Sequence, residues 1–104
     1  MSDAVSVTNN PAASRYEAWV GDQLAGFSQY VLADGLITFF HTEVRPAFEG
    51  RGIGGAIARF ALDDVAASGD RKVVPRCRFI RGWIDRHPEY RRLVDPTWPA
   101  PPED

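Results

Sequence analysis

The 104-residue chain is poor in sulfur, with one cysteine and one methionine. A single cysteine cannot form an internal disulfide, and this composition fits a reducing compartment. No apolar run approaches the roughly 20 residues that a membrane span needs. The N-terminus also lacks the basic and then apolar pattern of a secretory signal. We therefore expect a cytoplasmic protein that does not associate with membranes.

A strong charge of one sign is also missing, because 12 basic side chains face 14 acidic ones and the formal net charge is −2. Residues 71–95 are the exception, with eight bases against three acids, a local net charge of +5. A basic segment in an acidic protein fits a small phosphorylated ligand better than a nucleic acid. The alternative is that most of these arginines form a solvated surface.

Hydrophobic residues make up 44% of the chain and charged residues 25%, which is ordinary for one globular domain. Their order predicts a mixed α/β (α+β) domain over residues 1–94 and a proline-rich, extended or disordered tail over 95–104. Alternation and turn signals predict strands near 5–7, over 15–20, 24–32 and 36–44, and a short one over 72–74. Helical spacing predicts helices over about 52–68, 80–87 and 88–94. The sheet should be mostly antiparallel.

A glycine-rich run, Glu49-Gly50-Arg51-Gly52-Ile53-Gly54-Gly55, lies between the third long strand and the first predicted helix. Dense glycine lets the backbone approach a ligand closely, and a helix that begins there directs free N–H groups outward. Such a helix terminus attracts phosphate. The run therefore predicts a phosphate or pyrophosphate site, with a tight turn that binds nothing as the alternative.

Two well-known phosphate-binding loops can be compared with the glycine-rich run. A Walker A loop needs Gly-Lys followed by Ser or Thr, which the chain lacks. The dinucleotide pattern G-x-G-x-x-G matches literally at Gly50, Gly52 and Gly55. That pattern belongs after the first strand of a parallel βαβ unit, whereas here it follows an antiparallel meander. We therefore reject both types of nucleotide-binding loop.

The stretch from Val44-Arg45-Pro46 through the glycine run resembles motif A of the GNAT-type (GCN5-related) N-acetyltransferases. Three further blocks resemble the compact YjdJ-type subfamily: His41-Thr42-Glu43-Val44, Cys77-x-Phe79 and His87-Pro88-Glu89-Tyr90. The resemblance implies a twisted, mostly antiparallel sheet with a strand–glycine loop–helix site, without the helices that usually precede the meander. It implies acetyl transfer from acetyl-coenzyme A to an amine that the sequence does not identify. The alternative is a non-catalytic module that binds acyl-coenzyme A.

The same resemblance assigns the ligand contacts. The loop would bind pyrophosphate through Gly50, Arg51, Gly52, Ile53, Gly54 and Gly55, and the backbone of Val44 would pair with the pantetheine arm. Glu49 departs from the family pattern, where glutamine or arginine is usual. Because a carboxylate beside pyrophosphate is unfavourable, we expect its side chain to point away. We expect no metal site.

Two groups are candidates for the chemistry. Strand alternation places His41 and Glu43 on one face, where either could take the proton of the amine. The alternative is that Glu43 pairs with an arginine and His41 is only a hydrogen-bonded strand residue. Cys77, near a helix start and between two arginines, could accept the acetyl group. It could also simply be buried as a small apolar residue.

The general acid that would protonate the departing thiolate has no clear match in the sequence. Tyr90 is the one candidate, although it lies beyond the helix break at Pro88. His87 is expected to cap its helix or to touch phosphate. We expect the remaining large aromatic side chains to lie in the core: Phe39, Phe40, Phe60, Phe79 and Trp83.

Overall fold

The computed structural model describes residues 4–98 and contains one sheet with the strand order β1-β2-β3-β4-β5. The strands are β1 (Val5–Asn10), β2 (Arg15–Val20), β3 (Gln23–Ala33), β4 (Leu36–Val44) and β5 (Lys72–Pro75). The α-helices are α1 (Ile53–Ser68) and α2 (Arg78–Arg86), and the 3-10 helices are η1 (Pro11–Ala13), η2 (Pro46–Phe48) and η3 (Pro88–Leu93). The predicted order of elements is confirmed.

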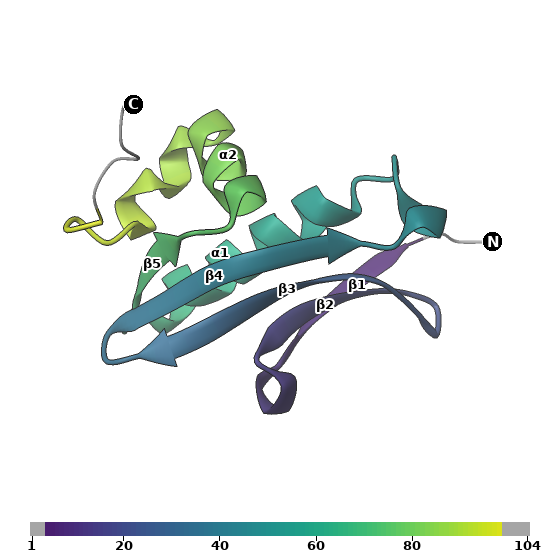
Figure 1. Ribbon diagram of the computed structural model, residues 1–104, viewed down its shortest axis with the longest axis horizontal. Coiled ribbons are helices and arrows are strands. Elements are labelled where there is room, and N and C mark those ends of the chain that lie inside the picture. The colour runs from purple at the N-terminus through teal and green to yellow at the C-terminus, as the bar shows by residue number, and fades with distance from the viewer. Residues whose placement is uncertain (1–3, 99–104) are drawn as a thin grey trace.

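The first four strands form an antiparallel meander, and β5 adds to β4 in parallel. Gly21 and Gly35 make the two tight hairpin turns with φ angles of 62° and 71°, a region that glycine enters without steric cost. The sheet is therefore mostly antiparallel, as the sequence predicts. Figure 1 shows the meander strands beside one another with α1 behind them.

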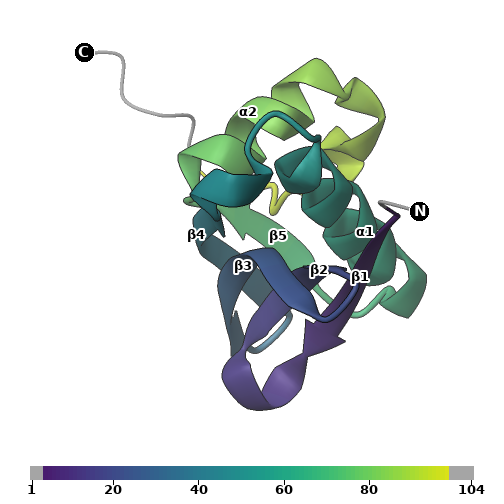
Figure 2. The same cartoon turned by 90° about the vertical axis from the view of Figure 1, so that its right-hand side faces the viewer.

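Helix α1 covers one face of the sheet and contacts all four meander strands. Its buried side chains are Ile53, Ile57, Ala58, Ala61, Leu62 and Val65. Helix α2 joins the same core through Ile80, Trp83 and Ile84. Figure 2 shows the sheet curving around α1, and within residues 4–98 no α-helix covers the other face of the sheet. No helix in the described part of the chain is long and apolar enough to cross a membrane.

A β-bulge divides β4. Tyr30 pairs with Phe39 and Gln29 pairs with His41, so that Phe40 has no opposite residue. An unpaired residue breaks the strict alternation of side chains across the sheet. Phe39 is fully buried, whereas Phe40 is 46% exposed.

The prediction that all large aromatic residues lie in the core is therefore wrong in part. Phe39 and Trp83 are buried, but Phe40, Phe60 and Phe79 are exposed by 46%, 40% and 37%. The bulge explains Phe40. Phe60 lies on the rim of α1, with its ring 6.0 Å from that of Tyr16. Phe79 is in the first turn of α2 and borders the cavity described below.

The chain continues as ordered structure beyond the predicted domain end. The Asp95 N–H donates to the carbonyl oxygen of Val73 at 2.8 Å, and the Trp98 N–H donates to that of Asp95 at 2.9 Å. The Arg76 guanidinium lies over the Trp98 ring. Residues 95–98 thus form a turn attached to β5, contrary to the prediction of an extended or disordered tail from 95. The rest of the tail, 99–104, is outside the described residues.

Candidate functional site

The loop between β4 and α1 contains two glycines in the left-handed region. Gly50 and Gly52 have φ angles of 80° and 75°, on either side of Arg51. A side chain at either glycine would be strained, which explains why the sequence repeats glycine there.

The amides of this loop are free to bind a ligand. The first backbone bond of α1 runs from the Ala56 N–H to the Gly52 carbonyl oxygen at 3.0 Å. Within residues 4–98, the amides of residues 50–55 have no hydrogen-bond acceptor. The positive end of the α1 dipole lies at the same place. The predicted anion site therefore has the donors it needs.

A cavity of about 290 Å³ opens beside these amides. It is lined by Val44, Phe48, Glu49, Gly50, Gly52, Ile53, Gly54, Gly55 and Phe79. Six of these nine residues are predicted ligand contacts. Glu49, which was expected to point away, and the two phenylalanines are additions that the sequence analysis did not assign to the site. The sequence offers one weak indication for Phe48, which is an apolar residue between Pro46 and the glycine run.

Gly54 also has a packing role. A Cβ atom at Gly54 would lie 2.8 Å from Cζ of Phe79, and one at Gly55 would lie 3.6 Å from Nε1 of Trp83. Helix α2 therefore crosses the first turn of α1 at very short range. Gly54 allows that close approach, whereas the Gly55 position has room for a Cβ atom. The pyrophosphate interpretation alone did not foresee this packing role of Gly54.

Gly26 of β3 lies in close contact with the end of β4 and with the first residue of α1. A Cβ atom there would lie 2.7 Å from the carbonyl oxygen of Glu43, 3.2 Å from Cγ2 of Ile53 and 3.3 Å from Cα of Val44. The first residue of α1 thus packs directly on the backbone of β3 and β4. This contact places the amides of the loop at the end of β4.

Strand β4 has a free edge next to the cavity. It pairs with β5 only from Leu36 to Phe39, where the partner of Phe39 is Pro75. Beyond that point, the Cys77 N–H donates to the Phe39 carbonyl oxygen at 2.8 Å and the chain turns into α2. Within the described residues, β4 from Phe40 to Val44 therefore has no strand partner on this side. Figure 1 shows β5 ending well before β4 does.

His41 and Glu43 lie together on the face of β4 that no helix covers, as alternation predicts. Nε2 of His41 is 3.2 Å from Oε1 of Glu43, and the two side chains are 50% and 54% exposed. The histidine ring also lies near the Phe27 ring, with the ring centres 6.0 Å apart and the planes tilted by 55°. Glu43 thus pairs with a histidine, not with an arginine as the alternative interpretation proposed.

Cys77 lies on the other side of β4. It is only 6% exposed, and its Sγ is 3.2 Å from Oγ1 of Thr42, which is 2.9 Å from Oγ of the buried Ser28. The thiol is therefore buried but has a polar contact, a combination that neither interpretation anticipated. The structure does not bring Cys77 together with His41 and Glu43, since Thr42 and its neighbours in sequence point to opposite faces.

The two remaining candidates have other partners. The Tyr90 hydroxyl donates to Asp63 at 2.7 Å, and Arg59 donates to it at 3.3 Å. The hydrogen bond to Asp63, together with burial, raises the pKa of Tyr90 and makes it a weaker acid. His87 has its Nδ1 2.8 Å from the Trp83 carbonyl oxygen at the end of α2. The expectation that His87 caps its helix is confirmed.

The charges around the cavity differ from the expectation that the basic segment 71–95 contributes to a phosphate site. No basic side chain from residues 71–95 lines the cavity, and Phe79 is the one residue of that segment that does. Arg51 lies in sequence between the lining residues Gly50 and Gly52, and its guanidinium is 5.4 Å from the centre of the Phe48 ring. Glu49 borders the cavity and has no ion-pair partner within residues 4–98.

The sequence and the fold were both compared with those of known proteins. Residues 15–93 match the family model of the GCN5-related N-acetyl-transferases. The fold matches the NMR solution structure of a GCN5-like protein from Staphylococcus aureus with a TM-score of 0.66 and 18% sequence identity, over 91% of each chain. No curated protein matches the sequence.

Proposed function

The chain belongs to the GCN5-related N-acetyltransferase family, and on this premise we propose that it transfers an acetyl group from acetyl-coenzyme A to an amine. The observation that carries the proposal is the row of unpaired amides at residues 50–55, which opens on a cavity beside the free edge of β4. The four sequence blocks support the YjdJ-type subfamily within this family. A protein of this kind acts where acetyl-coenzyme A is available, and the free Cys77 agrees with a reducing cytoplasm.

The proposed binding mode uses backbone groups. Acetyl-coenzyme A would supply the acetyl group as a thioester, a reactive acyl donor. The amides of residues 50–55 would hold the pyrophosphate, with Arg51 adding positive charge. The unpaired edge of β4 near Val44 would bind the amides of the pantetheine arm as an added strand does. Phe48 and Phe79 would cover its apolar side.

Direct transfer is the primary mechanism that we propose. The uncovered face of β4 is open to an amine, and there His41 and Glu43 form a hydrogen-bonded pair. An ammonium group must lose a proton before its nitrogen can attack a carbonyl carbon. His41 would take that proton, directly or through water, while Glu43 would stabilise the imidazolium that results. The amine nitrogen would then form the amide bond as the carbon–sulfur bond breaks, and the sulfur of coenzyme A would take the second proton that the nitrogen loses.

A relay through Cys77 is the second mechanism, and the contact with Thr42 favours it. A hydroxyl 3.2 Å from the sulfur can donate a hydrogen bond to a thiolate. The thiolate would attack the acetyl carbon, the bond from that carbon to the sulfur of coenzyme A would break, and coenzyme A would leave with the proton that Cys77 had lost. The amine would then cleave the thioester formed on Cys77.

The experiment is a transfer assay with acetyl-coenzyme A and a panel of primary amines, including lysine peptides and polyamines. Direct transfer predicts that His41→Gln and Glu43→Gln reduce the rate at least tenfold while Cys77→Ala does not. The relay predicts the reverse, with a mass increase of one acetyl group on Cys77 in the absence of amine. Tight binding of acetyl-coenzyme A without transfer to any amine would instead favour a non-catalytic acyl-coenzyme A module.

A further inference from the structure

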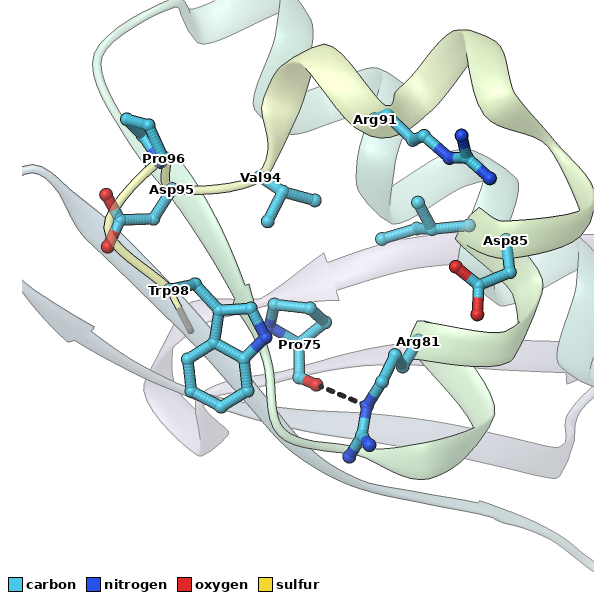
Figure 3. A pocket seen from close by; sticks show the side chains of 9 residues that line it. Pro75, Arg81, Asp85, Arg91, Val94, Asp95, Pro96 and Trp98 are labelled. Carbon is cyan, nitrogen blue, oxygen red and sulfur yellow. Dashed lines mark hydrogen bonds between the residues drawn. The ribbon is translucent and has the colours of Figure 1, made fainter. Parts of the chain in front are cut away.

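A second cavity, of about 390 Å³, lies between β5, α2, η3 and the turn at residues 95–98. Figure 3 shows this cavity and the side chains around it. None of its lining residues belongs to the cavity of the glycine loop. Its volume is within the range of small-molecule sites. Neither the family match nor the proposed function assigns it a role.

The floor and one wall of this cavity are apolar. They are formed by Pro75, Ile84, Val94 and Trp98. Two contacts hold Trp98 in this wall. Its backbone N–H donates to the carbonyl oxygen of Asp95, and the Arg76 guanidinium lies 5.3 Å from the centre of its indole ring. An aromatic wall held in this way is suited to contact an apolar group of a ligand.

The opposite rim carries charges of both signs. Figure 3 shows Asp85 between Arg91 and Arg81 along this rim. Arg81 is held by the carbonyl oxygens of Pro75 at 3.4 Å and Arg76 at 3.3 Å. Within residues 4–98, the side chains of Asp85 and Arg91 have neither a hydrogen-bond nor an ion-pair partner. These two side chains are free to pair with a ligand.

The fourth charged residue of the cavity is already paired within its own turn. The carboxylate of Asp95 accepts hydrogen bonds from the backbone N–H and the hydroxyl of Thr97. The lining thus has two arginines and two aspartates, and its formal charge is zero. A ligand that carries no net charge but has both an anionic and a cationic group would pair with both kinds of free side chain.

We propose that this cavity binds a free α-amino acid with a bulky apolar side chain. The carboxylate of the ligand would pair with Arg91 and with the remaining donors of Arg81, and its ammonium group would pair with Asp85. The apolar side chain would lie on Pro75, Val94 and Trp98. A simple carboxylic acid would leave Asp85 facing its negative charge, and a simple amine would leave the arginines unpaired.

The test is a titration of the full-length protein, without acetyl-coenzyme A, with L-leucine and L-phenylalanine, followed by amide chemical shifts. The expected result is saturable shifts in α2 and at residues 94–98 that leave residues 50–55 unchanged. Arg91→Gln and Asp85→Asn should each weaken binding about tenfold, because each removes a charge-assisted contact. Arg92→Gln is the matched control, since Arg92 is exposed on η3 and does not line the cavity.

Two ligand analogues keep the test independent of whether the variants fold. N-acetyl-leucine lacks the ammonium group and leucinamide lacks the carboxylate, so both should bind the wild-type protein at least tenfold more weakly than leucine. Equal binding of leucine and either analogue would overturn the proposal. An absence of saturable shifts with millimolar amino acid would do so as well. Because acetyl-coenzyme A is not present, either result leaves the proposed acetyl transfer unaffected.

Discussion

At the scale of single residues, Gly52 is the N-cap of α1 and has a left-handed φ of 75° within the glycine loop. Gly52→Ala should lower the stability by about 1–2 kcal/mol, the cost of a left-handed alanine, and weaken acetyl-coenzyme A binding at least tenfold. Gly35→Ala is the control, because Gly35 has a φ of 71° and equally open surroundings but lies in the β3–β4 turn. It should lose similar stability in urea and keep its affinity. Equal affinity losses in both variants would refute the assignment of the loop.

Glu49 is the residue where the loop departs from the family pattern. It borders the cavity without a partner within residues 4–98, and its negative charge opposes that of a pyrophosphate. Glu49→Gln should therefore tighten acetyl-coenzyme A binding about two- to fivefold at low ionic strength, and added salt should reduce the gain. Glu89→Gln, at the start of η3 and outside the cavity lining, should change nothing. A weaker affinity in Glu49→Gln would show that Glu49 supports the loop in some other way.

Glu17 gives the fold a pH dependence that can be measured. Burial raises the pKa of Glu17, but hydrogen bonds from Arg15, Asn10 and Trp19 outweigh this effect and hold the pKa below its ordinary value of 4.5. A carboxylate whose pKa is lower in the folded protein stabilises the fold above its unfolded pKa, and the contribution is lost as the pH falls through the folded value. Thermal melts should show that wild-type protein loses stability below pH 4.5 more steeply than Glu17→Gln. Asp22→Asn, in an exposed turn, should follow the wild-type profile.

At the scale of elements, the close contact between α1 and the β3–β4 pair positions the loop. Gly26→Ala would place Cβ 2.7 Å from the carbonyl oxygen of Glu43, a backbone atom that cannot move without disturbing the sheet. We expect a loss of about 1–3 kcal/mol in urea unfolding, together with weaker acetyl-coenzyme A binding. Gly82→Ala meets only ordinary contacts in α2 and should gain up to about 1 kcal/mol. A stable Gly26→Ala variant with normal affinity would contradict this account of the loop.

The elements themselves were largely predictable, because each carries a local signal. The Asp34-Gly35 turn, the change of period after Gly52 and the helix-ending Gly69 all act through nearby backbone geometry. Two features had no such signal. The bulge that exposes Phe40 depends on the pairing of β4 with β3. The turn at residues 95–98 depends on a hydrogen bond to Val73, more than 20 residues earlier.

At the scale of the whole molecule, the fold places the two candidate catalytic groups, the His41–Glu43 pair and Cys77, on opposite faces of the sheet. The helices cover one face of the sheet, where Cys77 and Thr42 meet, and leave the other face to His41 and Glu43. Alternation along β4 predicted that Thr42 faces away from His41 and Glu43, but it did not predict on which side Cys77 lies. The contact between Cys77 and Thr42 and the role of Phe79 could not be predicted, since both depend on how α2 crosses the sheet and the start of α1. The cavity beside α2 was also beyond prediction, because it combines side chains from four separate elements.

The most direct test of the central claim is a calorimetric titration of the reduced protein with acetyl-coenzyme A. NAD and a short oligonucleotide serve as controls for other phosphate-bearing ligands. We expect saturable binding of acetyl-coenzyme A at one site with micromolar affinity, and no heat from either control. An absence of heat from acetyl-coenzyme A, in a sample that circular dichroism shows to be folded, would contradict it. The glycine loop would then be a tight turn that holds α1 on the sheet and binds no cofactor.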